Sequence, residues 1–253
     1  ILDPAQQHAL CQEISTEIAS GQFKPAGESS REHWNEVWAT RAPLPTYMKP
    51  SPILRVNQQF VQPKDPWLEL FWYRRFRTQL LQTYFRDLPA IYEFGCGNGW
   101  NLQAARDCYP KKPLMGLDWA QTAIEQLPQG IHGRVFDFFH PDYDLKLAPN
   151  SGVWTVGALE QTGTAWGPFL EYLLANGPAV VVHVEPIVEW YDPANPVDFT
   201  AIQYHRARKY WLGFPAHMTA LAALGTAEIL EQKRSYFGSR YIEGYSLFCW
   251  KPI

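Results

Sequence analysis

The chain has 253 residues, of which 46% are hydrophobic, 19% charged and 15% aromatic, and its formal net charge is −3. This length fits one large domain, or one domain with an elaborated end, and the weakly acidic balance argues against a general nucleic-acid binder or a membrane-surface protein, since both need a basic face. No apolar run reaches transmembrane length, and the four scattered cysteines contain no C-x-x-C pair, so neither a disulfide framework nor a zinc site is indicated.

The beginning of the chain, Ile1 to Pro4, has neither a basic segment nor an apolar one, so it is not typical of a secretory signal peptide. The missing initial Met indicates a trimmed chain or a domain of a longer polypeptide. The sequence is also compatible with a homo-oligomer. The cysteine pattern favours a reducing compartment. We therefore expect a cytoplasmic protein without a bound metal ion.

The first part of the chain is expected to be mainly helical. Residues 3–20 carry apolar side chains at helical spacing. A second helix is expected to begin near Ser29 or Ser30, and it places Trp34 and Trp38 on one face.

Proline and arginine characterise the next two segments. Residues 42–66 are rich in proline and cannot form a continuous helix. Residues 67–88 predict a long helix that is apolar on one face and basic on the other, through Arg74, Arg75 and Arg77. We interpret this basic face as solvated in preference to phosphate-binding.

From residue 90 onward, short apolar segments alternate with helical ones. This alternation predicts parallel strand pairing and a doubly wound α/β sheet, in which ligands sit at the carboxyl ends of the strands. The expected strands are residues 90–94, 113–117, 133–136, 152–156 and 178–184. The expected helices are residues 100–108, 119–127, 165–175, 197–213 and 216–224. Two longer strands, 226–234 and 244–251, are expected to close the chain.

The first of these strands runs into a glycine-rich loop, residues 93–99 (EFGCGNG). Glycines allow a sharp turn and let a ligand lie against bare backbone, and the following helix offers unpaired N–H groups to a carboxylate. The loop is not the dinucleotide-binding fingerprint G-x-G-x-x-G. Counted from Gly95 the third glycine is replaced by Trp100, and counted from Gly97 it is replaced by Leu102.

An acidic residue followed by three glycines at alternate positions resembles the first motif of the class I S-adenosylmethionine (SAM)-dependent methyltransferases. Three later strand ends resemble that family in order and spacing. Asp118 lies about 20 residues past the glycines, where an acid accepts both ribose hydroxyls. In the family, an Asp at the position of Asp137 takes the adenine amino group, and Phe138 would pack against the ring. Residues 156–161 (VGALEQ) are similar to the family's Leu-Glu-His loop, with Gln161 in place of His.

Each of these residues also has an ordinary structural explanation. Asp118 could cap a helix, Asp137 could stabilise a turn, and Glu160 could be a solvated charge. Four matches in the right order, each at an expected strand end, favour cofactor binding. The cofactor-binding residues that the resemblance implies are Glu93, Gly95, Cys96, Gly97, Gly99, Asp118, Trp119, Asp137, Phe138, Gly157 and Ala158, with Glu93 acting indirectly by holding the loop or a water molecule near the methionine amino group.

The resemblance covers residues 90–251 and implies a Rossmann-like, doubly wound, seven-stranded sheet. The sheet would be mostly parallel with an antiparallel last strand. Residues 89–253 would form the SAM-binding domain. Residues 1–88 would form an N-terminal helical extension that serves as a lid and acceptor platform.

The acceptor side has several candidates for a general base. Alternation places His183 and Glu185 on one side of the fifth strand, where they could act as a base and its orienting partner. A hydrogen-bonded core histidine is the structural alternative. Glu160 and His205 are the further candidates, and the helix that carries His205 either lines the acceptor site or is solvated.

A looser resemblance concerns the acceptor. The block EHWN at 32–35, the segment YMKPSP at 47–52 and the acceptor-side motifs look like a group of bacterial methyltransferases associated with cell-surface polysaccharide gene clusters. This implies methyl transfer to an oxygen of a carbohydrate or sugar phosphate. The alternatives are a small-molecule N- or O-methyltransferase of another pathway, a nicotinamide oxidoreductase, which the missing third glycine disfavours, and a non-catalytic SAM-binding module, which Gln161 leaves open.

Overall fold

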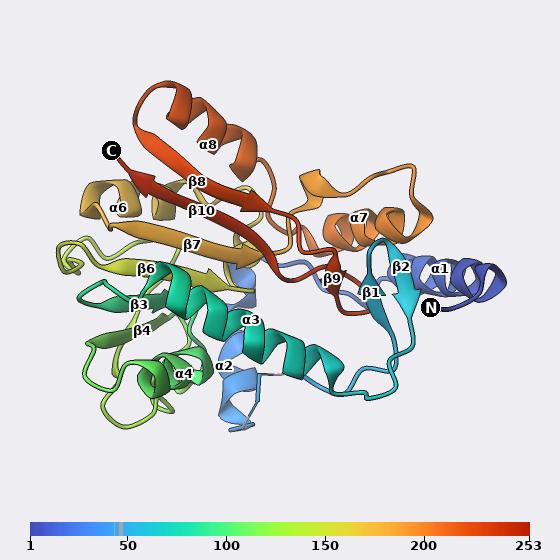
Figure 1. Cartoon of the computed structure of the whole chain (residues 1–253), viewed down its shortest axis with the longest axis horizontal. Helices are drawn as coiled ribbons and strands as arrows, with labels where there is room; N and C mark the ends of the chain where they lie inside the picture. Colours follow the sequence, from blue (N-terminus) through green and yellow to red (C-terminus); the bar gives the residue numbers. More distant parts are fainter. Residues whose placement is uncertain (43, 46–47) are drawn as a thin grey trace.

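A central seven-stranded sheet organises the computed structural model, which describes residues 1–42, 44–45 and 48–253. Its strands are β3 (Ile91–Phe94), β4 (Leu114–Asp118), β5 (His132–Val135), β6 (Gly152–Val156), β7 (Val180–Glu185), β8 (Ala227–Lys233) and β10 (Ser246–Pro252). They lie in the order β5-β4-β3-β6-β7-β10-β8. The pairings of β10 with β7 and with β8 are antiparallel, and the other pairings in this sheet are parallel. The predicted Rossmann-like sheet with an antiparallel last strand is confirmed (Figure 1).

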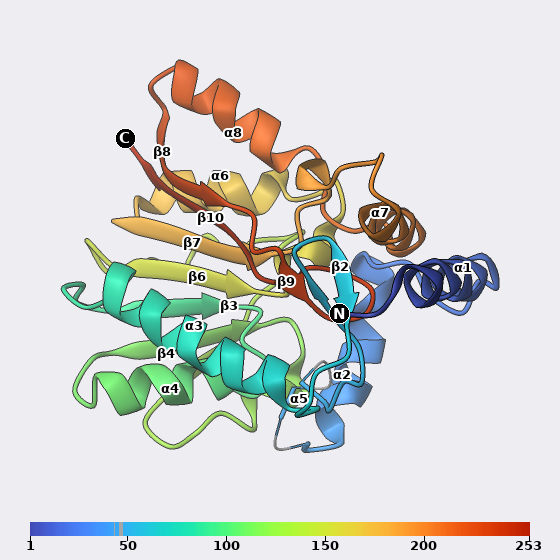
Figure 2. The same cartoon turned by 45° about the vertical axis from the view of Figure 1, so that its right-hand side comes forward.

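Helices cover both faces of this sheet (Figures 1 and 2). One apolar cluster joins the sheet to α3 (Leu68–Tyr84) and α4 (Trp100–Cys108), and the other joins it to α6 (Gly167–Asn176) and α8 (Phe214–Ala223). Because successive strand side chains point to opposite faces, Ile91 belongs to the first cluster and Tyr92 to the second. Helix α5 (Gln121–Ile124) is shorter than the helix expected at residues 119–127.

The parallel strands end at the edge of the sheet beside which Figure 1 shows α7 (Pro196–Arg208) and the N-terminal elements. Two N-terminal helices, α1 (Pro4–Ala19) and α2 (Arg31–Ala39), confirm the helical prediction for this region. Asp3 caps α1, because its side chain accepts a hydrogen bond from the backbone N–H of Gln6 at 2.9 Å. Among the described residues, no helix is long and apolar enough to cross a membrane.

The proline-rich segment contains two strands that the sequence did not predict, β1 (Leu54–Val56) and β2 (Gln59–Val61). With β9 (Phe237–Gly238) they form a small sheet in the order β2-β1-β9. Three-residue strands are too short to show a clear alternation of apolar and polar side chains. In this small sheet, β1 and β2 come from before residue 88 and β9 comes from after it, so the sheet spans the expected domain boundary. The division of the chain into two parts at residue 88 stays a prediction. Three residues of the segment, Pro43, Thr46 and Tyr47, lie outside the described residues.

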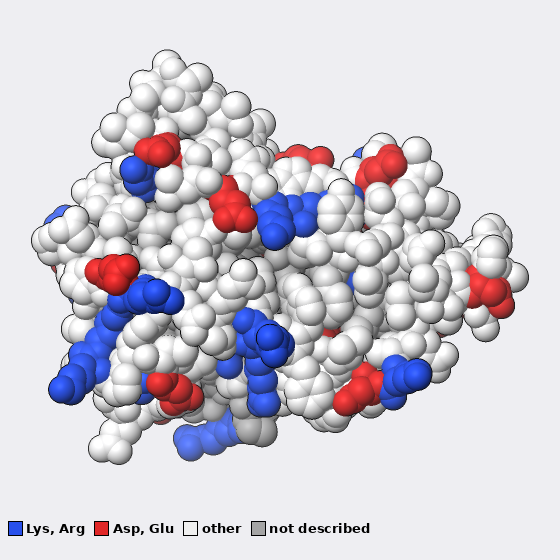
Figure 3. Space-filling model, in the orientation of Figure 1, with Lys and Arg blue, Asp and Glu red and all other residues white. Residues whose placement is uncertain are grey.

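The predicted basic face of α3 is only partly correct. Arg74 and Arg75 are exposed, as expected, but Arg77 is buried. Its guanidinium lies 4.1 Å from the centre of the Trp100 ring and donates a hydrogen bond to Asn101 Oδ1 at 3.1 Å. Figure 3 shows that acidic and basic side chains are dispersed over this face of the molecule, in keeping with the small net charge.

Candidate functional site

The glycine loop after β3 lies against the loop after β6. Gly95 has φ +71°, and a Cβ at this position would lie 2.2 Å from the Cβ of Ala158, so only glycine permits this approach. Gly97 has φ +51°, and a Cβ there would lie 2.3 Å from the Trp38 ring. A Cβ on Gly99 would instead meet Leu127 at 2.7 Å. Gly99 is not among the residues that line the pocket, and its predicted contact with the cofactor stays a prediction.

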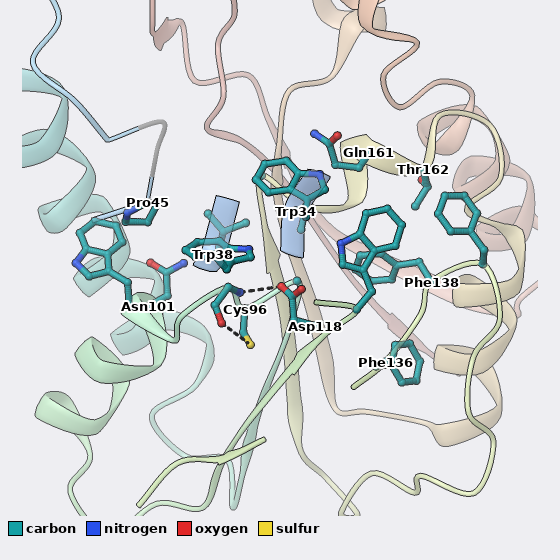
Figure 4. Close-up of a pocket in the computed structure, with 18 residues that line it drawn as sticks. Trp34, Trp38, Pro45, Cys96, Asn101, Asp118, Phe136, Phe138, Gln161 and Thr162 are labelled. Carbon is teal, nitrogen blue, oxygen red and sulfur yellow. Dashed lines mark hydrogen bonds between the residues drawn. The ribbon is translucent and has the colours of Figure 1, made fainter. Parts of the chain in front are cut away.

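One pocket lies where the ends of β3, β4, β5 and β6 meet (Figure 4). Most of the predicted cofactor residues line it, namely Gly95, Cys96, Gly97, Asp118, Trp119, Phe138, Gly157 and Ala158. Their contact with a cofactor stays a prediction. The sequence did not assign a further group of lining residues to the site, which are Trp34, Trp38, Pro45, Trp100, Asn101, Phe136, Phe139, Val156, Gln161 and Thr162.

Asp118 joins the glycine loop to β4. Its Oδ2 accepts a hydrogen bond from the backbone N–H of Gly97 at 2.9 Å, and its Oδ1 accepts one from the N–H of Ala120 at 2.9 Å. Burial raises the pKa of this carboxyl to about 6. Each carboxylate oxygen can accept more than one hydrogen bond, so Asp118 retains acceptor capacity for hydroxyl groups in the pocket.

Glu93 lies beneath the loop, does not line the pocket and is 1% exposed. Its Oε1 accepts a hydrogen bond from the Asn101 side chain at 2.8 Å, and Asn101 does line the pocket. This arrangement agrees with an indirect role for Glu93. Burial raises the pKa of Glu93 to about 8, although Asn101 and Arg77 favour the ionised form. At neutral pH the buried carboxyl is therefore mostly protonated.

Replacing Glu93 by Gln is expected to flatten the dependence of stability on pH. The pKa of Glu93 is raised from 4.5 to about 8 in the folded protein, so the folded state binds a proton more tightly than the unfolded state. The resulting stabilisation of the folded state is complete below pH 4.5 and is lost as the pH rises through 8. The difference is on the order of a few kcal/mol, because each pKa unit corresponds to about 1.4 kcal/mol. Melting temperatures from pH 5 to 9 should fall more steeply for the wild type than for Glu93→Gln. Parallel curves, or the same flattening in the exposed control Glu36→Gln, would contradict this assignment.

Helix α2 covers the pocket with Trp34 and Trp38, which lie one turn apart and point into it (Figure 4). Two hydrogen bonds hold α2 on the α5 region, from Gln126 Nε2 to the Trp38 carbonyl at 2.6 Å and from Thr122 Oγ1 to the Asn35 carbonyl at 2.9 Å. About 60 Å³ remains free in the pocket. Small-molecule sites have roughly 300–1,000 Å³. A ligand of that size therefore needs the α2 side chains to move.

Asp137 lies at the edge of the pocket and does not line it. Its Oδ1 accepts a hydrogen bond from the backbone N–H of Phe139 at 2.8 Å. Its other oxygen is 3.6 Å from the Arg31 guanidinium of α2 and 3.7 Å from His140 Nδ1. Asp137 thus links α2 to the end of β5, and its predicted contact with adenine stays a prediction.

The prediction that His183 faces the cleft is wrong. The imidazole is 1% exposed, with Nδ1 2.9 Å from Thr155 Oγ1 and Nε2 accepting a hydrogen bond from the Trp250 indole at 3.1 Å. Its ring packs between Trp211 and Phe214, on the face of the sheet that α8 covers. Burial lowers the pKa of His183 to about 3. His183 is therefore a neutral, hydrogen-bonded core residue.

Glu185 is likewise not the orienting partner of His183. Its carboxylate accepts hydrogen bonds at 3.1–3.2 Å from the backbone N–H groups of Ala158, Leu159 and Glu160. It holds the loop that forms one wall of the pocket. Burial and the charge of Glu185 raise the pKa of Glu160 well above its usual range, which disfavours its ionised form.

His205 occupies a different cavity from the glycine loop. It lies on α7, is 3% exposed, and lines a cavity of about 790 Å³ that shares Thr162 with the first pocket. Neither ring nitrogen has a hydrogen-bond partner within the described part of the chain. Burial is the main cause that lowers its pKa to about 3, and Arg55 contributes.

No protein-family model matches the chain, and no curated protein matches its sequence. Solved structures do match its fold. A SAM-dependent methyltransferase from Anabaena variabilis is 16% identical, with a TM-score of 0.51 over 91% of this chain and 98% of that one. The methyltransferase domain of bacterial CtHen1-C is 14% identical, with a TM-score of 0.50 over 71% of this chain and 96% of that one.

A third structure, the O-methyltransferase NcsB1 from neocarzinostatin biosynthesis, was solved with SAM and a naphthoic acid. It is 15% identical, with a TM-score of 0.48 over 74% of this chain. The chain spans 58% of that protein and about half of several others, such as 47% of a pericyclic reaction enzyme. The two structures with TM-scores of 0.51 and 0.50 show that the chain has the Rossmann-like fold of methyltransferases, and no more than the fold.

Proposed function

We propose that this protein is a SAM-dependent methyltransferase that acts on a small-molecule acceptor. One observation carries the proposal. The Asp118 carboxylate and the bare backbone of Gly97 meet at 2.9 Å in the wall of a pocket, at the carboxyl ends of parallel strands. An acid at this position suits the two hydroxyls of a ribose, and ligands of doubly wound sheets bind at this edge.

The pocket residues fit the parts of SAM. The bare backbone of the glycine loop lets the cofactor lie close to it, Asp118 accepts the ribose hydroxyls, and Phe138 and Trp119 offer ring faces for the adenine. Glu93, acting through Asn101, supports the loop near the methionine part. SAM supplies a methyl group on a sulfonium centre. The protein's own contribution is to hold an acceptor atom close and in line, which is worth about 7–11 kcal/mol of the barrier.

His205 is a weak candidate for the general base. Both of its ring nitrogens lack partners among the described residues, but burial lowers its pKa to about 3, so at pH 7 it holds a proton from a hydroxyl acceptor poorly. An acceptor that is already an anion needs no base. We keep a carbohydrate or sugar phosphate used in polysaccharide synthesis as the proposed acceptor. None of the structures named above supports a carbohydrate acceptor, and one of them contains a naphthoic acid.

Calorimetric titration tests the cofactor assignment. SAM and its demethylated product should bind at micromolar concentration, and NAD should not. Binding of NAD alone would favour an oxidoreductase. SAM binding without methyl transfer to any sugar, sugar phosphate or aromatic acceptor would favour a non-catalytic SAM-binding module. This is the second candidate function, and the observation in its favour is that Trp38 covers Gly97.

His183→Ala is expected to lower stability and to leave methyl transfer per folded molecule unchanged. The substitution removes the partners of the Trp250 N–H and the Thr155 hydroxyl in the core, at a cost of about 1–3 kcal/mol for unpaired buried groups. Melting temperature and turnover should be measured together, with His217→Ala as an exposed control on α8. A folded His183→Ala protein that turns over 100 times more slowly would return His183 to the mechanism.

A further inference from the structure

A groove lined by basic residues lies next to the cofactor pocket. It runs between residues 22–34 and the end of α7, and its volume is about 760 Å³. It shares Trp34 and Gln161 with the cofactor pocket, so the two are adjacent. We call it the basic groove, and its lining residues are Gln22, Phe23, Lys24, Pro25, Ala26, Ser29, Ser30, His33, Trp34, Gln161, Arg208 and Lys209.

The positive charges of the basic groove are not neutralised locally. Lys24, Arg208 and Lys209 form no ion pair with any residue that the structure describes, and the lining contains no Asp or Glu. The neighbouring Glu28 lies 3.7 Å from His140. Glu160 lies near enough to interact with Arg208, but it is not among the residues that line the groove, and burial raises its pKa well above its usual range.

Two buried polar atoms in this groove lack a hydrogen-bond partner within the described chain, Gln161 Oε1 and Arg208 Nε. Gln161 is 7% exposed, and its Nε2 already donates to Glu160 Oε1 at 3.0 Å. Figure 4 shows the Gln161 amide beyond the Trp34 ring, on the side away from Asp118. Buried polar atoms normally have partners, so these two atoms point to a ligand that supplies a donor to Gln161 and an acceptor to Arg208.

The position of these residues at a helix end does not account for the charge. Arg208 ends α7 and Lys209 caps it, where cations offset a helix dipole equivalent to roughly half a negative charge. Arg208 also lies over the Tyr210 ring, 5.0 Å from its centre. Together with Lys24 on the opposite wall, Arg208 and Lys209 bring three positive charges to the groove. Their sum exceeds the partial negative charge of the helix end severalfold.

We propose that the basic groove binds the acceptor of methyl transfer through an anionic group, a carboxylate, phosphate or sulfate, held by Arg208, Lys209 and Lys24. Gln161 Oε1 accepts a hydrogen bond from the acceptor at the end nearest the cofactor. The inference that the bound anion is a methyl acceptor rests on the proposed methyltransferase function. The binding of an anion to the groove can be measured whether or not the protein transfers methyl groups.

Calorimetry with two matched pairs of probes tests the proposal and separates two sources of the anion. Glucose 1-phosphate is compared with glucose, and 4-hydroxybenzoate with 4-hydroxybenzamide. The wild type should bind at least one anionic probe, and binding should weaken in 0.5 M salt because charge interactions are screened. Each neutral partner should bind at least tenfold more weakly than its anionic counterpart.

The double variant Arg208→Ala/Lys209→Ala should bind the anionic probe at least tenfold more weakly than the wild type. The control Arg74→Ala/Arg75→Ala removes the same charge from exposed positions on α3 and should bind normally. Equal binding of anionic and neutral probes, no binding of either, or equal losses in both double variants would overturn the proposal. Each protein is also titrated with SAM. Anion binding without SAM binding would refute the proposed function and leave the anion site intact.

Discussion

Gly97→Val is expected to abolish SAM binding, with an affinity at least roughly 100-fold below that of the wild type. Gly97 has φ +51°, a conformation that β-branched residues rarely adopt. A Cβ at this position would also project into the space between the loop and Trp38, which is the space that the cofactor needs. Calorimetric titration should show no heat of binding at SAM concentrations that saturate the wild type.

The control for this variant is Gly225→Val. Gly225 has a comparable φ of +71°, with nothing within 4 Å of an added Cβ, so it reproduces the backbone strain away from the pocket. Its SAM affinity should equal that of the wild type. If Gly97→Val melts at a temperature similar to Gly225→Val and binds SAM normally, the glycine loop is not the cofactor site.

Asp118→Ala is expected to weaken SAM binding by roughly tenfold or more. The substitution leaves two ribose hydroxyls without an acceptor, at a cost of about 1–3 kcal/mol. It also removes the acceptor for the backbone N–H groups of Gly97 and Ala120, so the loop loses its link to β4. Unchanged affinity in a protein with an unchanged circular dichroism spectrum would refute the ribose assignment.

The pH dependence of binding provides a second test of Asp118. Burial raises the pKa of this carboxyl to about 6, and the ionised form is the better acceptor for hydroxyl groups. The affinity of the wild type for SAM should therefore decline as the pH falls below 6. Asp118→Asn, which keeps the shape but cannot titrate, should bind weakly without this decline. The exposed control Asp144→Asn should retain the wild-type profile.

The sheet and the part of the pocket wall that lies at the strand ends could be predicted because their signals are local. Short apolar strands, the glycines after β3 and the acid at the end of β4 each appear within a few consecutive residues. In a parallel sheet, strand ends that are far apart in the sequence meet at one edge. The fold therefore brought Gly97, Asp118 and Ala158 together without any further information from the sequence.

The failed predictions concern residues whose surroundings come from distant segments. Alternation along β7 places His183 on one face of the sheet, but it does not reveal that α8 covers that face and that Trp250 pairs with the imidazole. The i, i+4 spacing of Trp34 and Trp38 indicates an apolar helix face and does not identify its partner. Only the structure shows that this face lies over Gly97.

The indole of Trp38 has a consequence for how fast a cofactor can associate. It lies on Gly97 and leaves little free volume, so if SAM binds there as proposed, productive collisions would be limited to the fraction of time in which α2 has moved away. The observed association rate should then stop rising with SAM concentration and reach a plateau equal to the opening rate of α2. Lid motions of this kind take microseconds to milliseconds. The α2 helix would thus set the upper limit of the association rate, well before diffusion does.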